Sequence, residues 1–538
     1  MENSTKTQHF EVLIMKELKL SELTTKQKLG MTLVARVYDG NIDYVVEQIK
    51  AHSLGGAWIT QGEKNRDALM KAVKDAADYP ILIMCDVEHG FDEYTIGRHN
   101  ALGCAGSEEL AYVFGKVTAV SAAKAGYNCV WNPVLDMPTT NYVCGGVIRS
   151  LGSDKYKVTA LAKAEARGLH DGGLLAMAKH FPGKGGESAR IDTHMGEAVT
   201  SVSKETVVDY YLYPYRELMK EGLLDGIGTG HIRFLDIDPE YPASLSKKVN
   251  DLIRDEGFDG LAMTDALDMM GVRARYGRHD TCAMALAAGN DMPLPFFPDH
   301  DTAYESLCEC YEAGMVTEER LNEAVRRVLE AQHKTLTPPK FTELTDEDIA
   351  LFHRINTDSV YRRVDDGISP TLDADGRYFF ALLTETPLDL ESHGKVAVET
   401  FTNDWYNPVL LAEKIKENFP NSTVYPITQF PSSPENKALL HASIGYDSVI
   451  FVTFTKTLTY VGTECLTSRI TSLINAMRMT DHVSTVVHFG NPFVLEDLSH
   501  IPRVLIGTTS TESSLAAIDV LAGKYPALGV MTYDVKLK

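Results

Sequence analysis

The feature that most constrains this chain is the regular alternation of short apolar runs with longer amphipathic stretches between residues 28 and 295. Short apolar runs bounded by turn residues are typical of buried strands, and the stretches between them have the spacing of helices. Repeated units of this kind form a parallel sheet, and eight of them fill an α/β fold of the (β/α)8 TIM-barrel type. The eight runs are 29–37, 56–60, 81–87, 129–135, 174–180, 226–231, 260–265 and 289–294.

A second unit follows a break in this pattern. After a helical stretch at 318–332, the consecutive prolines Pro338 and Pro339 favour an extended connection. The chain is therefore predicted to have a barrel at 1–335, a linker at 336–372 and a smaller three-layer α/β sandwich at 373–538. The apolar runs of this second part are 378–383, 395–398, 424–427, 449–454, 483–489 and 504–508.

Charge and terminal sequence exclude several classes of partner. Lys and Arg number 52 and Asp and Glu number 74, so the formal net charge is −22, which repels nucleic acid and anionic lipid surfaces. The N-terminus holds no apolar stretch long enough for a signal peptide or a membrane span. The eight cysteines form no CxxC pair and mostly lie in apolar runs, as reduced core thiols do. We predict a cytoplasmic protein that binds neither nucleic acid nor membrane, and leave its oligomeric state open.

The densest group of chemically active side chains lies at 178–194. A buried strand opens there into a glycine-rich loop that carries two histidines, two lysines and an aspartate. The loop does not satisfy the G-x4-G-K-[ST] pattern of a phosphate-binding loop. Asp192 lies two residues before His194, so its carboxylate can orient and charge-stabilise the imidazole. A solvated surface turn is the alternative.

Two further strand ends carry acids. Residues 257–265 read as a turn and a buried strand that ends at Asp265, where a carboxylate at the barrel mouth can act as nucleophile, base or ligand. A helix N-cap is the alternative role for Asp265. Asp86 and Glu88 follow another apolar run two residues apart, so both can reach the mouth if the strand stays regular. Otherwise they are solvated loop acids.

A catalytic metal is not expected. The side chains that could converge on one are His180, His194, His231, Asp86 and Asp265. However, the sequence holds no HExxH motif, no histidine pair at helical spacing and no cluster of cysteine and histidine. We therefore predict no metal in the active site and no cofactor.

In their order along the chain, these segments resemble glycoside hydrolase family 3, and in particular its β-N-acetylglucosaminidase branch. KHFPGKG at 179–185 followed by DTH at 192–194 is similar to that branch's K-H-F-P-G-x-G loop, which ends in D-[S/T/Q]-H. GFDGLAMTD at 257–265 is similar to the family's nucleophile segment, G-F-x-G-[LV]-x-x-[ST]-D. Further similar segments are CDVEHG at 85–90, NPVLD at 132–136, RSLGSD at 149–154, YPASLS at 241–246, AGNDM at 288–292 and GNP at 490–492.

The resemblance implies an exo-acting, retaining enzyme that hydrolyses terminal β-linked N-acetylglucosamine from a carbohydrate substrate without a cofactor. Asp265 would attack the anomeric carbon, and His194, held by Asp192, would replace the usual second carboxylic acid as general acid and base. The residues implied in binding the sugar hydroxyls are Asp86, Arg149, Lys179 and His180. The chain departs from the family pattern at Lys184, where histidine is usual, at His89, which replaces a glycine, and in a longer loop before Asp192.

Three alternatives remain open. A β-glucosidase or related β-glycosidase of the same family could take its acid from the second unit, where the candidates are Glu385, Asp389, Glu391 and Glu464. A barrel lyase could use Lys179 as a Schiff-base amine, which requires an apolar pocket that lowers the pKa of Lys179. A sugar-binding protein could keep the fold without activity. The residues leave open the aglycone, the linkage, and whether water or phosphate is the acceptor.

Overall fold

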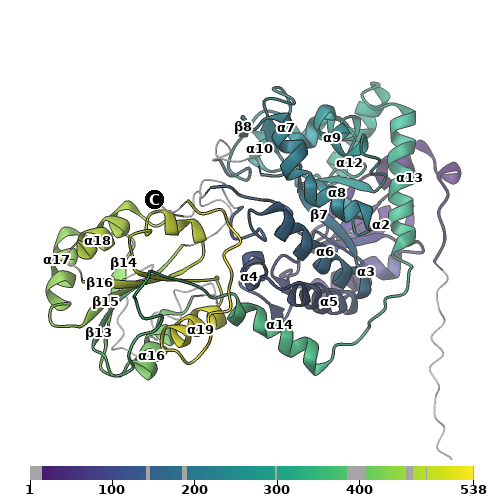
Figure 1. Cartoon of the computed structure of the whole chain (residues 1–538). Helices are drawn as coiled ribbons and strands as arrows, with labels where there is room; N and C mark the ends of the chain where they lie inside the picture. The colour runs from purple at the N-terminus through teal and green to yellow at the C-terminus, as the bar shows by residue number, and fades with distance from the viewer. Residues whose placement is uncertain are drawn as a thin grey trace, which may run out of the picture.

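The chain forms two α/β units, each built around one main sheet (Figure 1). The computed structural model describes residues 15–140, 146–184, 191–296, 300–384, 406–455, 465–479 and 482–536. The apolar core of the first unit extends to Ile355, and that of the second begins at Val360. The two sheets therefore have separate cores.

The first unit contains a curled parallel sheet of seven strands in the order β1-β2-β3-β6-β7-β9-β11. The strands are β1 (Val34–Arg36), β2 (Gly56–Trp58), β3 (Leu82–Cys85), β6 (Cys129–Val130), β7 (Leu175–Phe181), β9 (Gly226–Thr229) and β11 (Leu261–Thr264). Parallel neighbours need long crossovers, and helices supply them. The principal helices are α1 (Thr25–Met31), α2 (Ile42–Lys50), α3 (Arg66–Ala76), α4 (His99–Ala105), α5 (Glu108–Ala125), α6 (Lys155–Asp171), α8 (Tyr213–Lys220), α9 (Lys247–Arg254), α11 (Arg278–Ala287), α12 (His300–Glu312) and α13 (Glu318–Lys334).

Seven of the eight predicted runs coincide with these strands to within a few residues, and two runs need correction. Residues 29–31 belong to the end of α1, because Thr24 caps a helix that begins just before them. The eighth run, 289–294, forms no strand of the sheet and makes a single parallel bridge between Met263 and Met292.

The buried carboxylate of Asp291 holds this eighth run in place. Arg254 and Arg320 approach it to 2.7 and 2.6 Å, and Arg327 to 3.2 Å. The amide of Ala262 donates a hydrogen bond of 2.9 Å to the same carboxylate. Because Ala262 lies near the start of β11, this ion cluster is at the amino end of the strand, opposite the end at which barrel enzymes place their chemistry.

The second unit contains six strands in the order β12-β17-β16-β15-β13-β14, and β12 alone runs antiparallel to its neighbour. The strands are β12 (Tyr361–Val364), β13 (Tyr378–Thr384), β14 (Thr423–Thr428), β15 (Ser448–Phe454), β16 (Val483–Phe489) and β17 (Arg503–Gly507). Figure 1 shows α16 and α19 on one side of this sheet and α17 and α18 on the other. These helices are α16 (Pro408–Asn418), α17 (Ser433–Ala442), α18 (Ser468–Arg478) and α19 (Thr511–Leu521). The predicted run at 395–398 lies outside the described residues.

The segment predicted as a linker, 336–372, contains helix α14 (Asp346–Asp358) and strand β12. Helix α14 packs against α4 and α5 of the first unit and against α19 of the second (Figure 1). Strand β12 is not among the predicted runs, because its sequence, YRRV, is not an apolar run. A half-exposed strand at the edge of a sheet does not need one. The unit boundaries at 335 and 373 stay a prediction.

The described ranges contain free cysteine thiols and no helix suited to crossing a membrane. None of the helices there combines the length and the apolar character that crossing a bilayer requires. The cysteines described are free thiols: Cys85, Cys104, Cys129, Cys282, Cys308, Cys310 and Cys465. Cys144 lies outside the described residues, and the cytoplasmic location stays a prediction.

Acid should destabilise the second unit through His488. This buried side chain of β16 lies 2.9 Å from the hydroxyl of Thr453 and 3.3 Å from that of Thr455, which are neutral partners. Burial lowers the pKa of His488 to about 3, whereas an unfolded histidine titrates near 6.5. The unfolded chain therefore binds the extra proton as pH falls from about 6.5 to 3, and the free energy of unfolding falls by up to about 1.4 kcal/mol per pH unit.

Urea unfolding between pH 7 and pH 4 measures this effect. We expect His488→Gln to reduce the slope of unfolding free energy against pH, while the same change at exposed His353 leaves the slope unaltered. Parallel curves for wild type and His488→Gln would exclude this role of His488.

Candidate active site

Four of the seven predicted site residues lie at the carboxyl ends of parallel strands of one sheet. Asp86 directly follows β3, and Asp265 directly follows β11. Lys179 and His180 are near the end of β7, which is buried along its whole length. Because parallel strands of one sheet end at the same edge, side chains far apart in the sequence meet there.

Glu88 brings three of the predicted residues together. It accepts hydrogen bonds from Nε and Nη2 of Arg149 at 2.7 and 2.5 Å, and Nζ of Lys179 lies 2.6 Å from its Oε1. Lys179 also pairs with Asp86 at 2.5 Å. Burial opposes the charge of Glu88, but the charges of Arg149 and Lys179 hold its pKa well below the ordinary value. Glu88 is therefore ionised, and both of its carboxylate oxygens accept hydrogen bonds.

The surroundings of Lys179 contradict the lyase alternative. Burial acts to lower the pKa of Lys179, but the adjacent carboxylates of Asp86 and Glu88 raise it above its ordinary value. Its ammonium therefore stays protonated. A Schiff-base lysine must instead present a neutral amine.

His180 is held by Asp136, which follows β6. Nδ1 of His180 lies 2.7 Å from the carboxylate of Asp136, and the backbone amide of His180 donates to the same group at 3.2 Å. Burial and then the charge of Lys184 lower the pKa of His180 to about 4, so the ring is neutral at pH 7. Because Nδ1 donates to Asp136, Nε2 is the acceptor, and it lies 3.4 Å from Arg149 and 3.8 Å from Asp265.

Asp265 is an ionised carboxylate at the edge of this cluster. Its backbone amide donates to the carbonyl of Thr229 at 2.8 Å, and its carboxylate accepts from the amide of Ala266 at 2.8 Å. Burial opposes ionisation, but His180, His231, the Ala266 amide and Lys184 together lower the pKa of Asp265 below its ordinary value. Near pH 7, where His180 is neutral, the Ala266 amide and the Lys184 ammonium remain as stabilising groups. The side chain keeps 22% of its surface exposed, so a ligand can reach it.

Asp192 and His194 form the predicted pair. Nδ1 of His194 donates to Oδ1 of Asp192 at 2.7 Å, and the His194 amide donates to the same oxygen at 3.0 Å. The carbonyl of Thr193, between them, accepts from the amide of Gly271 at 2.7 Å. A Cβ at Gly271 would lie 3.1 Å from the Cβ atoms of both Thr193 and His231, so the absence of a side chain lets this loop approach closely.

His231 also contacts the segment that follows Asp265. Its Nε2 donates to the carbonyl of Ala266 at 2.9 Å, and its Nδ1 lies 2.8 Å from the hydroxyl of Ser244. His231 and Thr193 therefore contact the same segment, 266–271, which follows Asp265. Residues 185–190 of the loop, including Gly185 and Gly186, are outside the described residues.

Three participants were not among the predicted site residues. In the sequence, Glu88 is only a companion of Asp86, and His231 is only a possible metal ligand. Asp136 ends the segment NPVLD and closes an apolar run, which is the same local signal that identified Asp265. The acid that closes this apolar run is therefore the sequence signal for Asp136.

The C-terminal segment supports the part of the chain that carries Arg149. The hydroxyl of Tyr533 lies 3.0 Å from the carbonyl of Val147 and 2.9 Å from that of Ser150. It therefore contacts the backbone before and after Arg149 in the sequence. The amide of Ser153 donates to the carbonyl of Thr532 at 2.8 Å. The end of the chain thus packs against the first unit.

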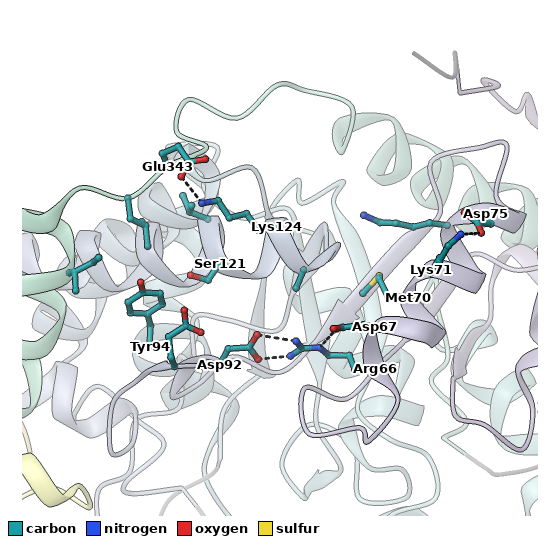
Figure 2. A pocket seen from close by; sticks show the side chains of 16 residues that line it. Arg66, Asp67, Met70, Lys71, Asp75, Asp92, Tyr94, Ser121, Lys124 and Glu343 are labelled. Atoms are coloured by element: carbon teal, nitrogen blue, oxygen red, sulfur yellow. Dashed lines mark hydrogen bonds and ion pairs between the residues drawn. The ribbon is translucent and has the colours of Figure 1, made fainter. Parts of the chain in front are cut away.

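A large open cavity lies elsewhere on the first unit. Figure 2 shows it beside α3 and α5, with Arg66 paired to Asp92 and Lys124 paired to Glu343. Its volume is about 820 Å³, but it shares no lining residue with the cluster around Asp265. Most of its charged groups already form ion pairs with one another, so size alone does not make it the candidate active site.

Comparison with known proteins identifies the family. Residues 19–331 match the model of the glycosyl hydrolase family 3 N terminal domain, which is more than half of the 538 residues. The chain therefore belongs to glycosyl hydrolase family 3.

Two relatives are similar in sequence. A β-N-acetylglucosaminidase/β-glucosidase of Cellulomonas fimi is 28% identical over 338 residues, which are 58% of this chain and 57% of that protein. A β-hexosaminidase of Tolumonas auensis is 31% identical over 277 residues, which are 49% of this chain and 81% of that protein. The match thus spans little more than half of the Cellulomonas fimi relative.

Two solved structures share the fold. A family 3 β-N-acetylglucosaminidase from Paenibacillus sp. str. FPU-7 superposes with a TM-score of 0.77 at 24% identity, covering 96% of this chain and 100% of that one. The β-glucoside phosphorylase BglX superposes with a TM-score of 0.76 at 22% identity, covering 96% of this chain and 94% of that one. At these identities the likeness concerns the fold alone.

Proposed function

We propose that this chain is a retaining, exo-acting β-N-acetylglucosaminidase that hydrolyses terminal β-linked N-acetylglucosamine. The observation that carries the proposal is the Asp192–His194 pair, which Thr193 ties to Gly271 in the segment that follows the ionised Asp265. A nucleophilic carboxylate must stay ionised, and an imidazole paired with a carboxylate can both donate and accept a proton. The names of the Cellulomonas fimi and Tolumonas auensis relatives support the sugar.

In the proposed first step, a carboxylate oxygen of Asp265 forms a bond to the anomeric carbon while the bond from that carbon to the leaving oxygen breaks. His194 gives a proton from Nε2 to the leaving oxygen, and Asp192 stabilises the ring through Nδ1. In the second step His194 takes a proton from water, whose oxygen displaces Asp265 from the anomeric carbon. Two inversions at one carbon give overall retention.

The cluster around Glu88 would bind the sugar. Asp86 is half exposed, so it can accept a hydroxyl hydrogen bond while it remains paired with Lys179. Arg149 can donate to a sugar oxygen, and Nε2 of neutral His180 can accept from a hydroxyl. Glu88 keeps both cations in place.

The proposed enzyme also needs a continuous wall around the site. We infer that residues 289–294 act as the eighth member of a (β/α)8 barrel and that the second unit is a three-layer sandwich. The bridge from Met263 to Met292 supports this inference on one side. The Met292 methyl group lies against Gly55 and Gly56, beside and within β2, so this side chain packs inside the curled sheet.

Turnover of two aryl glycosides tests the sugar specificity. We expect an aryl N-acetyl-β-glucosaminide to be cleaved with a higher kcat/KM than the matching aryl β-glucoside. The reverse preference would favour the β-glucosidase alternative, which the double name of the Cellulomonas fimi relative keeps open. Repeating the assay with inorganic phosphate separates the two acceptors, because phosphorolysis releases a sugar 1-phosphate.

Acids of the second unit provide a further prediction. Glu385, Asp389, Glu391 and Glu464 lie outside the described residues. If His194 is the general acid, alanine at each of these four positions should leave most of kcat for a substrate with a poor leaving group. A loss at one of them that matches the loss in His194→Ala would move the acid to the second unit.

A further inference from the structure

Three side chains that commonly bind metal ions meet on the outside of the first unit, away from the site described above. His279 and Asp280 lie in the first turn of α11, and Cys310 lies in α12. Sγ of Cys310 is 3.7 Å from both Nδ1 of His279 and Oδ1 of Asp280, which are themselves 2.5 Å apart. Within the described part of the chain, this is the one group of three or more such side chains whose ligand atoms lie this close together.

Glu309 orients the histidine of this group. Its Oε2 lies 2.9 Å from Nε2 of His279, so the carboxylate directs Nδ1 toward Asp280 and Cys310. In metal sites, the ring nitrogen that does not bind the ion usually donates to a carboxylate in this way. Ion pairing at the surface requires only the histidine and the carboxylates. It does not require the Cys310 thiol to lie beside both His279 and Asp280.

The spacing suits a small tetrahedral ion. Bonds of about 2.0–2.3 Å from zinc to nitrogen, oxygen and sulfur separate the donor atoms by roughly 3.3–3.6 Å. The two distances from Cys310 are already close to this range. The distance from His279 to Asp280 must widen by less than about 1 Å, and both side chains are 56% exposed and can move.

We propose that His279, Asp280 and Cys310 bind a zinc-class divalent cation, with Glu309 as the residue that orients His279. The combination of imidazole, carboxylate and thiolate favours zinc over magnesium or calcium. Cys310 releases its thiol proton to solvent as its sulfur binds, and water fills the fourth position on the exposed side. The ion would tie the start of α11 to α12, independently of the proposed glycosidase activity.

Cobalt substitution tests the site in the full-length protein. After treatment with a chelator, titration with Co²⁺ should produce one thiolate-to-cobalt charge-transfer band per chain, which zinc then displaces. We expect the band in wild type and in Cys308→Ser, a matched control on the same helix, but not in Cys310→Ser. Saturating zinc should raise the Tm of wild type and Cys308→Ser by a few degrees, since it binds only the folded chain.

A second variant covers the case in which Cys310→Ser does not fold. His279→Gln changes an exposed side chain, and it should weaken Co²⁺ binding at least tenfold without lowering the Tm of the metal-free protein. The proposal is overturned if wild type gives no thiolate band. It is also overturned if the band survives both substitutions, or is lost in Cys308→Ser instead, because the ion then binds elsewhere.

Discussion

Asp265→Asn is expected to abolish glycoside cleavage, with a fall in kcat of at least about 10³-fold. The amide has nearly the same shape and can still accept the hydrogen bond from Ala266, so the fold should be retained. It cannot form the covalent glycosyl-enzyme, because a neutral amide is a poor nucleophile. Rates on an aryl N-acetyl-β-glucosaminide, together with the urea midpoint of each protein, measure the effect.

Asp268→Asn is the matched control for this experiment. Asp268 lies three residues further along the same loop and is partly exposed. It should keep near-normal kcat. Near-normal activity in a well-folded Asp265→Asn protein would contradict the assignment of Asp265 as the nucleophile. An equal loss of activity in both variants would indicate that the substitutions disturb the loop and not the reaction step.

His194→Ala is expected to slow substrates with poor leaving groups by roughly 10²–10⁴-fold, and activated aryl glycosides far less. An activated leaving group departs with little protonation, so removing the acid matters little in its first step. Water must still be deprotonated in the second step, so the covalent intermediate should accumulate with activated substrates. Kinetics across a series of leaving groups, with mass spectrometry of the protein, measure both effects.

Two neighbouring substitutions make this result specific. Asp192→Asn should give a smaller defect of the same kind, because the imidazole stays but loses its charged partner. Met195→Ala removes an exposed side chain next to His194 and should change little. If His194→Ala lowers the rates of all substrates by one common factor, the loop only binds or shields the sugar, and the acid must be sought elsewhere.

The sequence alone determined where strands end and which polar groups stand at those ends. The apolar runs before Asp86, Asp136 and Asp265 are local patterns, because burial of a parallel strand on both faces demands consecutive apolar residues. The same reasoning predicted seven strands of the first sheet. Residues 289–294 form a single bridge instead of a strand, since Met292 and Leu294 are their only large apolar residues and the ion cluster of Asp291 holds them in place of a full ladder. The same reasoning missed β12, whose edge position does not require an apolar sequence.

Only the tertiary structure decided which side chains at the strand ends contact one another. Glu88 joins Arg149 to Lys179, and Asp136 fixes the tautomer of His180, although these partners are tens of residues apart in the sequence. Whether Lys179 is a neutral amine or an ammonium ion depends on these partners and not on its neighbours in the chain. The charge state of a side chain is set by burial and by the charges within a few ångströms, and the path of the loops determines both.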